Sequence, residues 1–356
     1  MKQNWFKKEI DKFSKLSGYK KPEKYSNIIK LDSNENYAID PEFISSLIEK
    51  TQARLDVREY PLGGTERLVD SLSQYLKLPP EMIGVGNGSD QIIDLILGNF
   101  ASSKTTILTS NPTFGFFEER CNLYSIPTIK IPFEKNMTLD LEKFLKNFNK
   151  ASILYLDSPN NPTGFQFPRK QLERLIHEFK GLVIIDEAYV EFSDSSIVDI
   201  AKKADNIMVL RTLSKSFGLA GLRIGYFVAN KNVVDIFTRV IQYPYPLNSV
   251  AIETGIVALQ HSKHFAEVAE IVKKERKRII EKLREMSVFE VFDSQANFVL
   301  FDANGSSQRI YKALIEQGIA IKNLGKIGKH EGCLRVTVGS QTMNSKFLTA
   351  IRDLLN

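Results

Sequence analysis

The stretch Ile207–Val228, with the sequence IMVLRTLSKSFGLAGLRIGYFV, decides the fold. It opens with the apolar run Ile207–Arg211 and closes with a second one, Ile224–Val228, and both have the length and composition of buried strands. A segment of hydroxyl and small residues around Lys215 separates them. Similar apolar runs recur upstream, at Thr106–Thr109, Thr128–Pro132, Ile153–Asp157 and Leu182–Asp186.

Helical patterns lie between several of these runs or flank them, at Gln91–Phe100, Gln171–Phe179 and Val233–Ile241. Strands that alternate with helices form βαβ units. The pattern therefore predicts an α/β fold, with a mainly parallel sheet and helices on both faces. In such sheets ligands gather at the carboxyl ends of the strands.

The pattern changes after about Pro246. A long helical stretch, Asn248–Met286, is followed by strand-like runs and by further helices, at Phe289–Phe292, Asn297–Phe301, Gln308–Gln317, Leu334–Val338 and after Ser340. This succession predicts a smaller α+β domain. We expect a large domain over residues 35–246, and an N-terminal arm (residues 1–34) with a small domain (residues 247–356).

Composition excludes several classes of protein. The net charge is +6, and the densest basic run, Lys273–Arg278, lies in a helical pattern and is interpreted as a solvated helix face, so we expect no nucleic-acid partner. No apolar stretch is long enough to cross a membrane. Cys121 and Cys333 are far apart and indicate reduced thiols in a cytoplasmic protein. The four histidines form no metal-binding pattern.

Lys215 is the first candidate for chemistry. A lysine that follows a strand, among hydroxyls and small apolar residues, can lose its hydration and have its pKa lowered. A Schiff-base amine requires this property. Thr212, Ser214 and Arg223 lie close by in sequence and could together hold a phosphate group.

Asp186 ends the strand-like run Leu182–Asp186. A carboxylate there could face a pyridine nitrogen and keep it protonated, which makes the ring an electron acceptor. Tyr189, three residues on, could bind a ring oxygen. Each also has a purely structural interpretation, as a turn cap and as a half-buried core residue.

Two turn-like segments complete the set. Ser158–Gly164 (SPNNPTG) offers the amide of Asn161 to a ring oxygen or a substrate, although its composition is also that of an ordinary turn. Gly88, Ser89 and Asp90 open a helix, where free N–H groups bind anions, and Ser89 could equally be a simple N-cap.

Together these residues resemble the fold-type I pyridoxal-5′-phosphate (PLP) aminotransferases, and within them the histidinol-phosphate aminotransferase branch. The resemblance covers nearly the whole chain. It rests on the motifs Leu31–Asn36, Tyr60-Pro61, Gly88–Asp90, Pro112–Gly115, Pro159–Gly164, Asp186–Phe192, Ser214-Lys215 with Arg223, Ala296–Phe298 and Leu334–Gly339.

The resemblance implies a role for each cofactor residue. Lys215 would link covalently to PLP and act as general base and acid, and Asp186 would pair with the ring nitrogen. The other residues would bind the ring oxygen (Tyr189, Asn161), stack on the ring (Phe114, where the family often has Tyr) and hold the phosphate (Ser89, Asp90, Thr212, Ser214, Arg223). Tyr60 would reach the cofactor phosphate of a second copy, which implies a homodimer.

At the substrate end, Arg335 matches the arginine that binds the anionic group of the substrate. Lys322 stands where the family has a second arginine, and it would bind phosphate as a point charge. Tyr19 resembles an N-terminal tyrosine that reaches the substrate phosphate of the partner. Asn34, within Leu31–Asn36, is also expected at the substrate.

The implied reaction converts glutamate and imidazole-acetol phosphate to 2-oxoglutarate and histidinol phosphate, a step of histidine biosynthesis. The alternatives are an aromatic amino-acid aminotransferase, a PLP decarboxylase of a phosphorylated amino acid, and a non-catalytic PLP-fold binding or regulatory protein.

Overall fold

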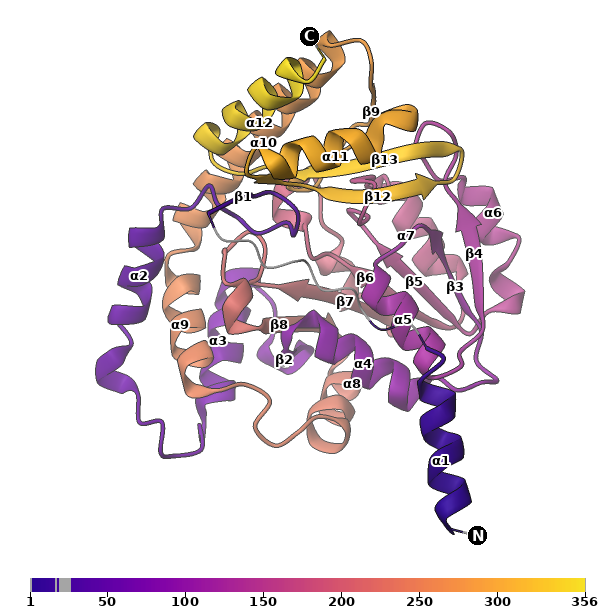
Figure 1. Ribbon diagram of the computed structural model, residues 1–356. Helices are drawn as coiled ribbons and strands as arrows, with labels where there is room; N and C mark the ends of the chain where they lie inside the picture. Colours follow the sequence, from indigo (N-terminus) through magenta and orange to yellow (C-terminus); the bar gives the residue numbers. More distant parts are fainter. Residues whose placement is uncertain (1, 17, 19–26, 356) are drawn as a thin grey trace.

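A seven-stranded sheet forms the centre of the computed structural model, which describes residues 2–16, 18 and 27–355 (Figure 1). The strand order is β2-β8-β7-β6-β5-β3-β4, and β8 alone runs opposite in direction to the other strands. The strands are β2 (Ile83–Asn87), β3 (Ile107–Asn111), β4 (Thr128–Pro132), β5 (Ile153–Asp157), β6 (Leu182–Asp186), β7 (Ile207–Thr212) and β8 (Ile224–Ala229). The predicted α/β fold is confirmed.

Both faces of this sheet are buried. Val183 and Ile185 of β6 point into one apolar core, while Ile184 between them points into another. Side chains alternate across a strand, so a strand buried on both faces is apolar throughout. The helices before and around this sheet are α2 (Pro41–Glu49), α3 (Gly64–Leu76), α4 (Gly88–Phe100), α5 (Gly115–Leu123), α6 (Leu141–Leu145), α7 (Arg169–Glu178), α8 (Lys231–Ile236) and α9 (Ser249–Gln260).

Strand β2 was not predicted, because its sequence IGVGN contains two glycines, which weaken a strand pattern. The structure explains Gly84. A Cβ atom there would lie 2.2 Å from the ring of Phe227 on the neighbouring strand β8. Only glycine lets this aromatic side chain cover β2.

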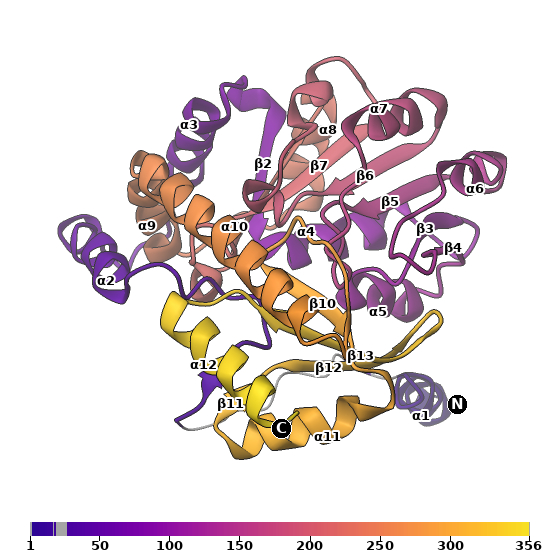
Figure 2. The ribbon, with the colours of Figure 1, turned by 90° about the horizontal axis from the view of Figure 1, so that it is seen from above.

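A second sheet, of order β12-β13-β10-β9, lies in the C-terminal part of the chain. Figure 2 shows the three C-terminal helices lying over it. Its strands are β9 (Glu290–Val291), β10 (Phe298–Asp302), β12 (Lys322–Ile327) and β13 (His330–Thr337). The three helices are α10 (Ser262–Glu285), α11 (Ser307–Glu316) and α12 (Gln341–Asp353). Strand β1 (Ile29–Lys30) pairs with β11 (Ile319–Ala320), so the N-terminal segment joins this part. The exact domain bounds remain a proposal.

The predicted helical stretch Asn248–Met286 is two helices, α9 and α10, that meet at His261. In a continuous helix, the backbone N–H of His261 would donate to the carbonyl oxygen of Val257. Here the imidazole Nδ1 of His261 lies 2.8 Å from that oxygen. That N–H bonds Ala258 instead. A side chain therefore competes with the backbone for one carbonyl group.

The basic run Lys273–Arg278 is not entirely solvated, so that interpretation was wrong for one of its arginines. Arg276 is buried, and its Nη1 donates to the carbonyl oxygens of Phe192 and Ala296, both at 2.8 Å. Long cationic side chains can cross a helix surface to reach such acceptors. Arg276 thus joins α10 to the segments before and after it.

The N-terminal helix α1 (Lys2–Phe13) projects from the body of the chain (Figure 1). Its large apolar side chains, including Trp5 and Phe6, are exposed. Among the residues that the structure describes, no helix is both long and apolar enough to span a membrane.

Candidate active site

A cavity of about 890 Å³ gathers most of the residues that the sequence singled out. Those that line it are Asn34, Ser89, Asp90, Phe114, Asn161, Asp186, Tyr189, Thr212, Ser214, Lys215, Arg223, Lys322 and Arg335. Two are not among them. Tyr60 is 73% exposed and stacks on the ring of Tyr245, and Tyr19 lies outside the described residues.

The convergence follows from the parallel sheet. Asp157 ends β5 and is the register partner of Asp186, which ends β6, and Thr212 ends the next strand, β7. Parallel neighbours place their carboxyl ends at one edge of the sheet. The polar residues that follow these strands therefore meet, although they are far apart in sequence.

Lys215 lies just beyond β7, inside the cavity. Its Nζ is 3.4 Å from the carbonyl oxygen of Ser33 and 5.5 Å from the centre of the Tyr189 ring. Burial, and next the positive charge of Arg335, lower the pKa of Lys215 to about 8. The lowered pKa leaves a larger neutral, nucleophilic fraction of this amine at neutral pH than an exposed lysine has.

Asp186 is buried and lines the same cavity. Its Oδ2 accepts a hydrogen bond from the Tyr155 hydroxyl at 3.1 Å, and its Oδ1 accepts one from the N–H of Ala188 at 3.0 Å. Burial, and next the negative charge of Asp157, raise the pKa of Asp186 to about 7. A protonated pyridine nitrogen would supply the countercharge that stabilises the carboxylate, so this residue fits the PLP ring.

Tyr189 serves both the core and the cavity. Its ring packs edge-on against Phe298, and its hydroxyl accepts a hydrogen bond from Nδ2 of Asn34 at 3.0 Å. Burial raises the pKa of Tyr189 to about 12, so the phenol keeps its proton and can donate it to an oxygen in the cavity. Asn34 thus positions Tyr189, a contact that the sequence did not predict.

A phosphate group fits at the start of α4. Gly88 has a φ of +77°, and a Cβ atom there would lie 2.6 Å from Nη2 of Arg223. Glycine therefore makes room for the guanidinium, which Asp90 holds at 2.8 Å. The first N–H groups of a helix lack intrahelical partners and bind anions.

The hydroxyls of Thr212 and Ser214, 2.9 Å apart, are buried and line the same cavity. With the first turn of α4 and Arg223 they form a cradle for an anion. A group with a ring nitrogen, an aldehyde and a phosphate is thus matched at three points by Asp186, Lys215 and this cradle.

The four-stranded sheet of the C-terminal part, called the small sheet below, also contributes to the wall of the cavity. Lys322 of β12 and Arg335 of β13 are register partners, so their side chains project from the same face. Arg335 donates to Oδ1 of Asn161 at 2.5 Å and to the carbonyl oxygen of Asp32 at 2.8 Å. These contacts hold the guanidinium in the wall of the cavity that the cofactor residues also line.

Comparison with known proteins agrees with this geometry. The sequence profile described as "Aminotransferase class I and II" matches residues 26–351. The chain belongs to this aminotransferase family. It is 32% identical over 357 residues to the histidinol-phosphate aminotransferase of Thermoanaerobacter pseudethanolicus, covering 100% of both chains. It is 34% identical over 326 residues to that of Pyrococcus furiosus, covering 91% of this chain and 92% of the relative.

A solved structure is also similar, the histidinol-phosphate aminotransferase from Clostridium acetobutylicum. Its TM-score is 0.83 at 28% identity, with 92% of this chain and 99% of the other covered. The protein is thus a PLP-dependent aminotransferase, which confirms the predicted enzyme class and cofactor.

Two residues of the aminotransferase site escaped the sequence analysis. Asp157 lies in the cavity wall and accepts hydrogen bonds from Thr113, Asn160 and the N–H of Asn161. Its position at the end of a strand-like run, like that of Asp186, was an available signal. Tyr155 stacks on Phe117 with ring centres 3.7 Å apart and bonds Asp186. A tyrosine inside an apolar strand gives no such signal.

Proposed function

We propose that this aminotransferase moves an amino group from glutamate to imidazole-acetol phosphate, which gives 2-oxoglutarate and histidinol phosphate. The observation that carries the proposal is the pair of cations Arg335 and Lys322 in the lining of the cavity that Lys215 and Asp186 also line. The names of the relatives in Thermoanaerobacter and Pyrococcus support this substrate.

We propose that Lys215 is the catalytic amine. When bound, PLP supplies an aldehyde that links to amines and a ring that accepts electron density from the substrate Cα. Lys215, with its pKa lowered to about 8, takes the proton from Cα and returns it later. A base with a pKa near the working pH suits a proton transfer in both directions.

The remaining cofactor residues hold and orient the ring in this proposal. Asp186 holds the proton on the ring nitrogen, Tyr189 and Asn161 bind the ring oxygen, and Phe114 covers the ring. The cradle of Ser89, Asp90, Thr212, Ser214 and Arg223 holds the phosphate. A ring fixed at three points presents the Cα of the substrate to Lys215 in one orientation.

The substrates share one anion site in this proposal. Arg335 provides a planar fork for a carboxylate, and Lys322 provides a point charge beside it for the larger phosphate. Both substrates are anionic at this end, so one site can serve both half-reactions. Asn34 contributes in this proposal by positioning the Tyr189 hydroxyl. The contact of Tyr19 with the substrate phosphate of the partner stays a prediction.

Replacing Arg335 with Ala (Arg335→Ala) is expected to slow both half-reactions by about 10- to 100-fold, because each loses a charge-assisted hydrogen bond worth about 1.5–3 kcal/mol. Single-turnover absorbance changes of the cofactor, with glutamate and separately with histidinol phosphate, measure the two. Arg309→Ala, on the exposed side of α11, is the matched control. A loss confined to one half-reaction would disprove the shared site.

The same assay ranks substrates. Histidinol phosphate should react faster than phenylalanine or threonine phosphate. Preference for phenylalanine would favour the aromatic aminotransferase, and release of carbon dioxide from threonine phosphate would favour the decarboxylase.

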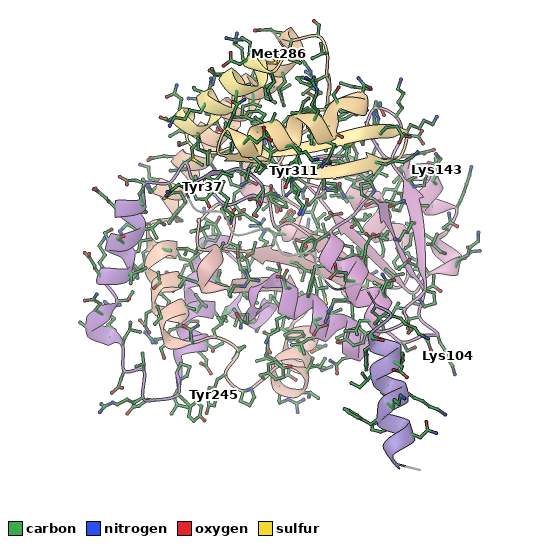
Figure 3. All side chains as sticks on the ribbon, in the orientation of Figure 1. Tyr37, Lys104, Lys143, Tyr245, Met286 and Tyr311 are labelled. Atoms are coloured by element: carbon green, nitrogen blue, oxygen red, sulfur yellow. The ribbon has the colours of Figure 1, made fainter. Side chains whose placement is uncertain are left out.

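We propose that the enzyme is a homodimer in the cytoplasm. Tyr60 and Tyr245 stack at the surface, and Val57 and Leu62 nearby are more than three-quarters exposed. Figure 3 shows Tyr245 at the edge of the molecule. A patch of this kind is typical of an interface, and it would bring Tyr60 to the cofactor phosphate of the second copy.

Sedimentation equilibrium should therefore give twice the chain mass of 40.4 kDa. Tyr60→Ala should weaken the retention of PLP, whereas Val288→Ala, at an exposed position just after α10, should not. A monomer at micromolar concentration with full activity would contradict the dimer.

A further inference from the structure

We propose that Glu290, Asp302 and His330 bind a divalent transition-metal ion of the zinc class. The three residues come from β9, β10 and β13 and meet near the tip of the β12–β13 hairpin, and none of them lines the active-site cavity. The sequence showed no metal pattern because the ligands are separated along the chain and meet only through strand pairing.

The ligand atoms have the spacing that a metal ion needs. Nδ1 of His330 lies 3.1 Å from Oδ2 of Asp302 and 3.6 Å from Oε2 of Glu290. A tetrahedral zinc ion with bonds of about 2.0–2.1 Å sets neighbouring ligand atoms about 3.3 Å apart. Glu290 and Asp302 are register partners on β9 and β10, so both carboxylates project from one face of the sheet.

The imidazole is oriented for metal binding. Its Nε2 lies 2.8 Å from the carbonyl oxygen of Lys135, which can only accept, so Nε2 carries a proton. In the neutral ring, Nδ1 then presents a lone pair to two carboxylates. A backbone carbonyl bonded to the far nitrogen of a ligating histidine is a recurrent feature of metal sites.

Hydrogen bonds from the backbone also fix the carboxylate of Asp302. Its Oδ1 accepts from the N–H groups of Asn304 at 2.8 Å and Gly332 at 3.0 Å, which leaves Oδ2 directed at His330. The residues His330 and Asp302 are buried, so their ligand atoms are already withdrawn from water. A site prepared in this way loses little conformational freedom when an ion binds.

A second proton on His330 is the simpler alternative to a metal ion. The two differ in the positive charge that they bring to the two carboxylates. That proton adds one positive charge and could bond Asp302, but Glu290 at 3.6 Å is beyond hydrogen-bond range. A divalent ion balances both carboxylates. The Glu290 side chain is 46% exposed, which leaves an entry path and a fourth position for water. Nitrogen and carboxylate ligands together favour zinc over calcium or magnesium.

The site would also join two parts of the chain. Lys135 lies on the loop after β4 of the large sheet, whereas the ligands belong to the small sheet. Figure 1 shows the β12–β13 hairpin reaching toward this loop. A bound ion would hold His330 in the orientation that bonds Lys135.

The test is calorimetric titration of the chelator-treated holoenzyme with Zn²⁺, together with visible d–d absorption on adding Co²⁺. We expect one equivalent to bind, a rise in the thermal unfolding temperature with Zn²⁺, and at least about a tenfold loss of affinity in Glu290→Gln. Glu331→Gln, an exposed neighbour with the same change of charge, should bind as the unaltered protein does.

Two outcomes would overturn the proposal. Absence of saturable binding would mean that the three side chains hold no metal ion. Equal affinity in Glu290→Gln and Glu331→Gln would place the ion elsewhere, for example on the cofactor. Asp302→Asn is a second variant, and Glu290→Gln keeps the test decisive if Asp302→Asn does not fold, because Glu290 is half exposed.

Discussion

The variant Lys215→Ala is expected to lose turnover by at least about 10⁴-fold, because one side chain supplies both the covalent amine and the base that moves the Cα proton. PLP should still bind, since the ring and phosphate contacts proposed for Asp186 and Arg223 are intact. Steady-state rates with glutamate, and the cofactor retained after gel filtration, measure the two properties.

A positive charge alone should not rescue the reaction. Lys215→Arg keeps a cation in the cavity, but a guanidinium stays protonated and cannot act as nucleophile or base. Lys215→Ala should fold, because it removes an amine whose charged form is already disfavoured at this buried position. Lys215→Arg places a permanent charge there, so its folding is checked separately by circular dichroism. Retention of more than a hundredth of the activity in either variant would refute the role of Lys215.

Asp186→Asn is expected to lower kcat by about 10²- to 10³-fold, the range found when a preorganised electrostatic contact is removed. The amide has nearly the same shape: its Oδ1 can still accept from the N–H of Ala188, and its NH2 would donate to the Tyr155 hydroxyl instead of accepting from it. It carries no charge, however, to hold a proton on the ring nitrogen. Asp235→Asn, on the exposed surface of α8, is the matched control. A kcat within about threefold of the unaltered enzyme would contradict the proposed pairing.

A second readout for Asp186→Asn needs no turnover. In the cofactor-free protein the pKa of Asp186 is raised from 3.8 to about 7, chiefly by burial. Between these values the folded state holds a proton that the unfolded state has lost. The free energy of unfolding should therefore fall as pH rises from about 4 to 7, by at most about 1.4 kcal/mol per pH unit for this group.

The variant cannot take up this proton, so its free energy of unfolding should depend less on pH. Urea unfolding at pH 4.5 and pH 7 measures the difference. Part of the slope should persist, because the pKa of Asp157 is also raised, to about 6, mainly by burial. Identical slopes in the variant and the unaltered protein would show that Asp186 is ionised throughout this range.

Local patterns in the sequence were sufficient for six of the seven strands of the large sheet and for most of the candidate cofactor residues. Apolar runs of strand length between helical patterns specify buried parallel strands, and the polar residues directly after such runs must gather at one edge. Lys215, Asp186 and Thr212 are of this kind. Asp186 is placed by β6, and Thr212 and Lys215 are both placed by β7, so a few neighbouring residues reveal each of them.

Other features depended on how distant segments pack. Asn34 meets Tyr189, and Arg335 meets Asn161, across large separations in sequence. Strand β2 was hidden by glycines that accommodate Phe227. The cluster of Glu290, Asp302 and His330 exists only because β9, β10 and β13 pair in one register.

The sequence by itself thus determined the α/β class, which follows from periodicity, and the chemical groups of the candidate cofactor site, which follow strand-like runs. The family came from the resemblance of motifs spread along nearly the whole chain. Tertiary structure alone decided which side chains touch, and how deeply Lys215 and Asp186 are buried. Burial is the first cause of both pKa shifts, and it is a property of the packed chain, which no short stretch of residues contains.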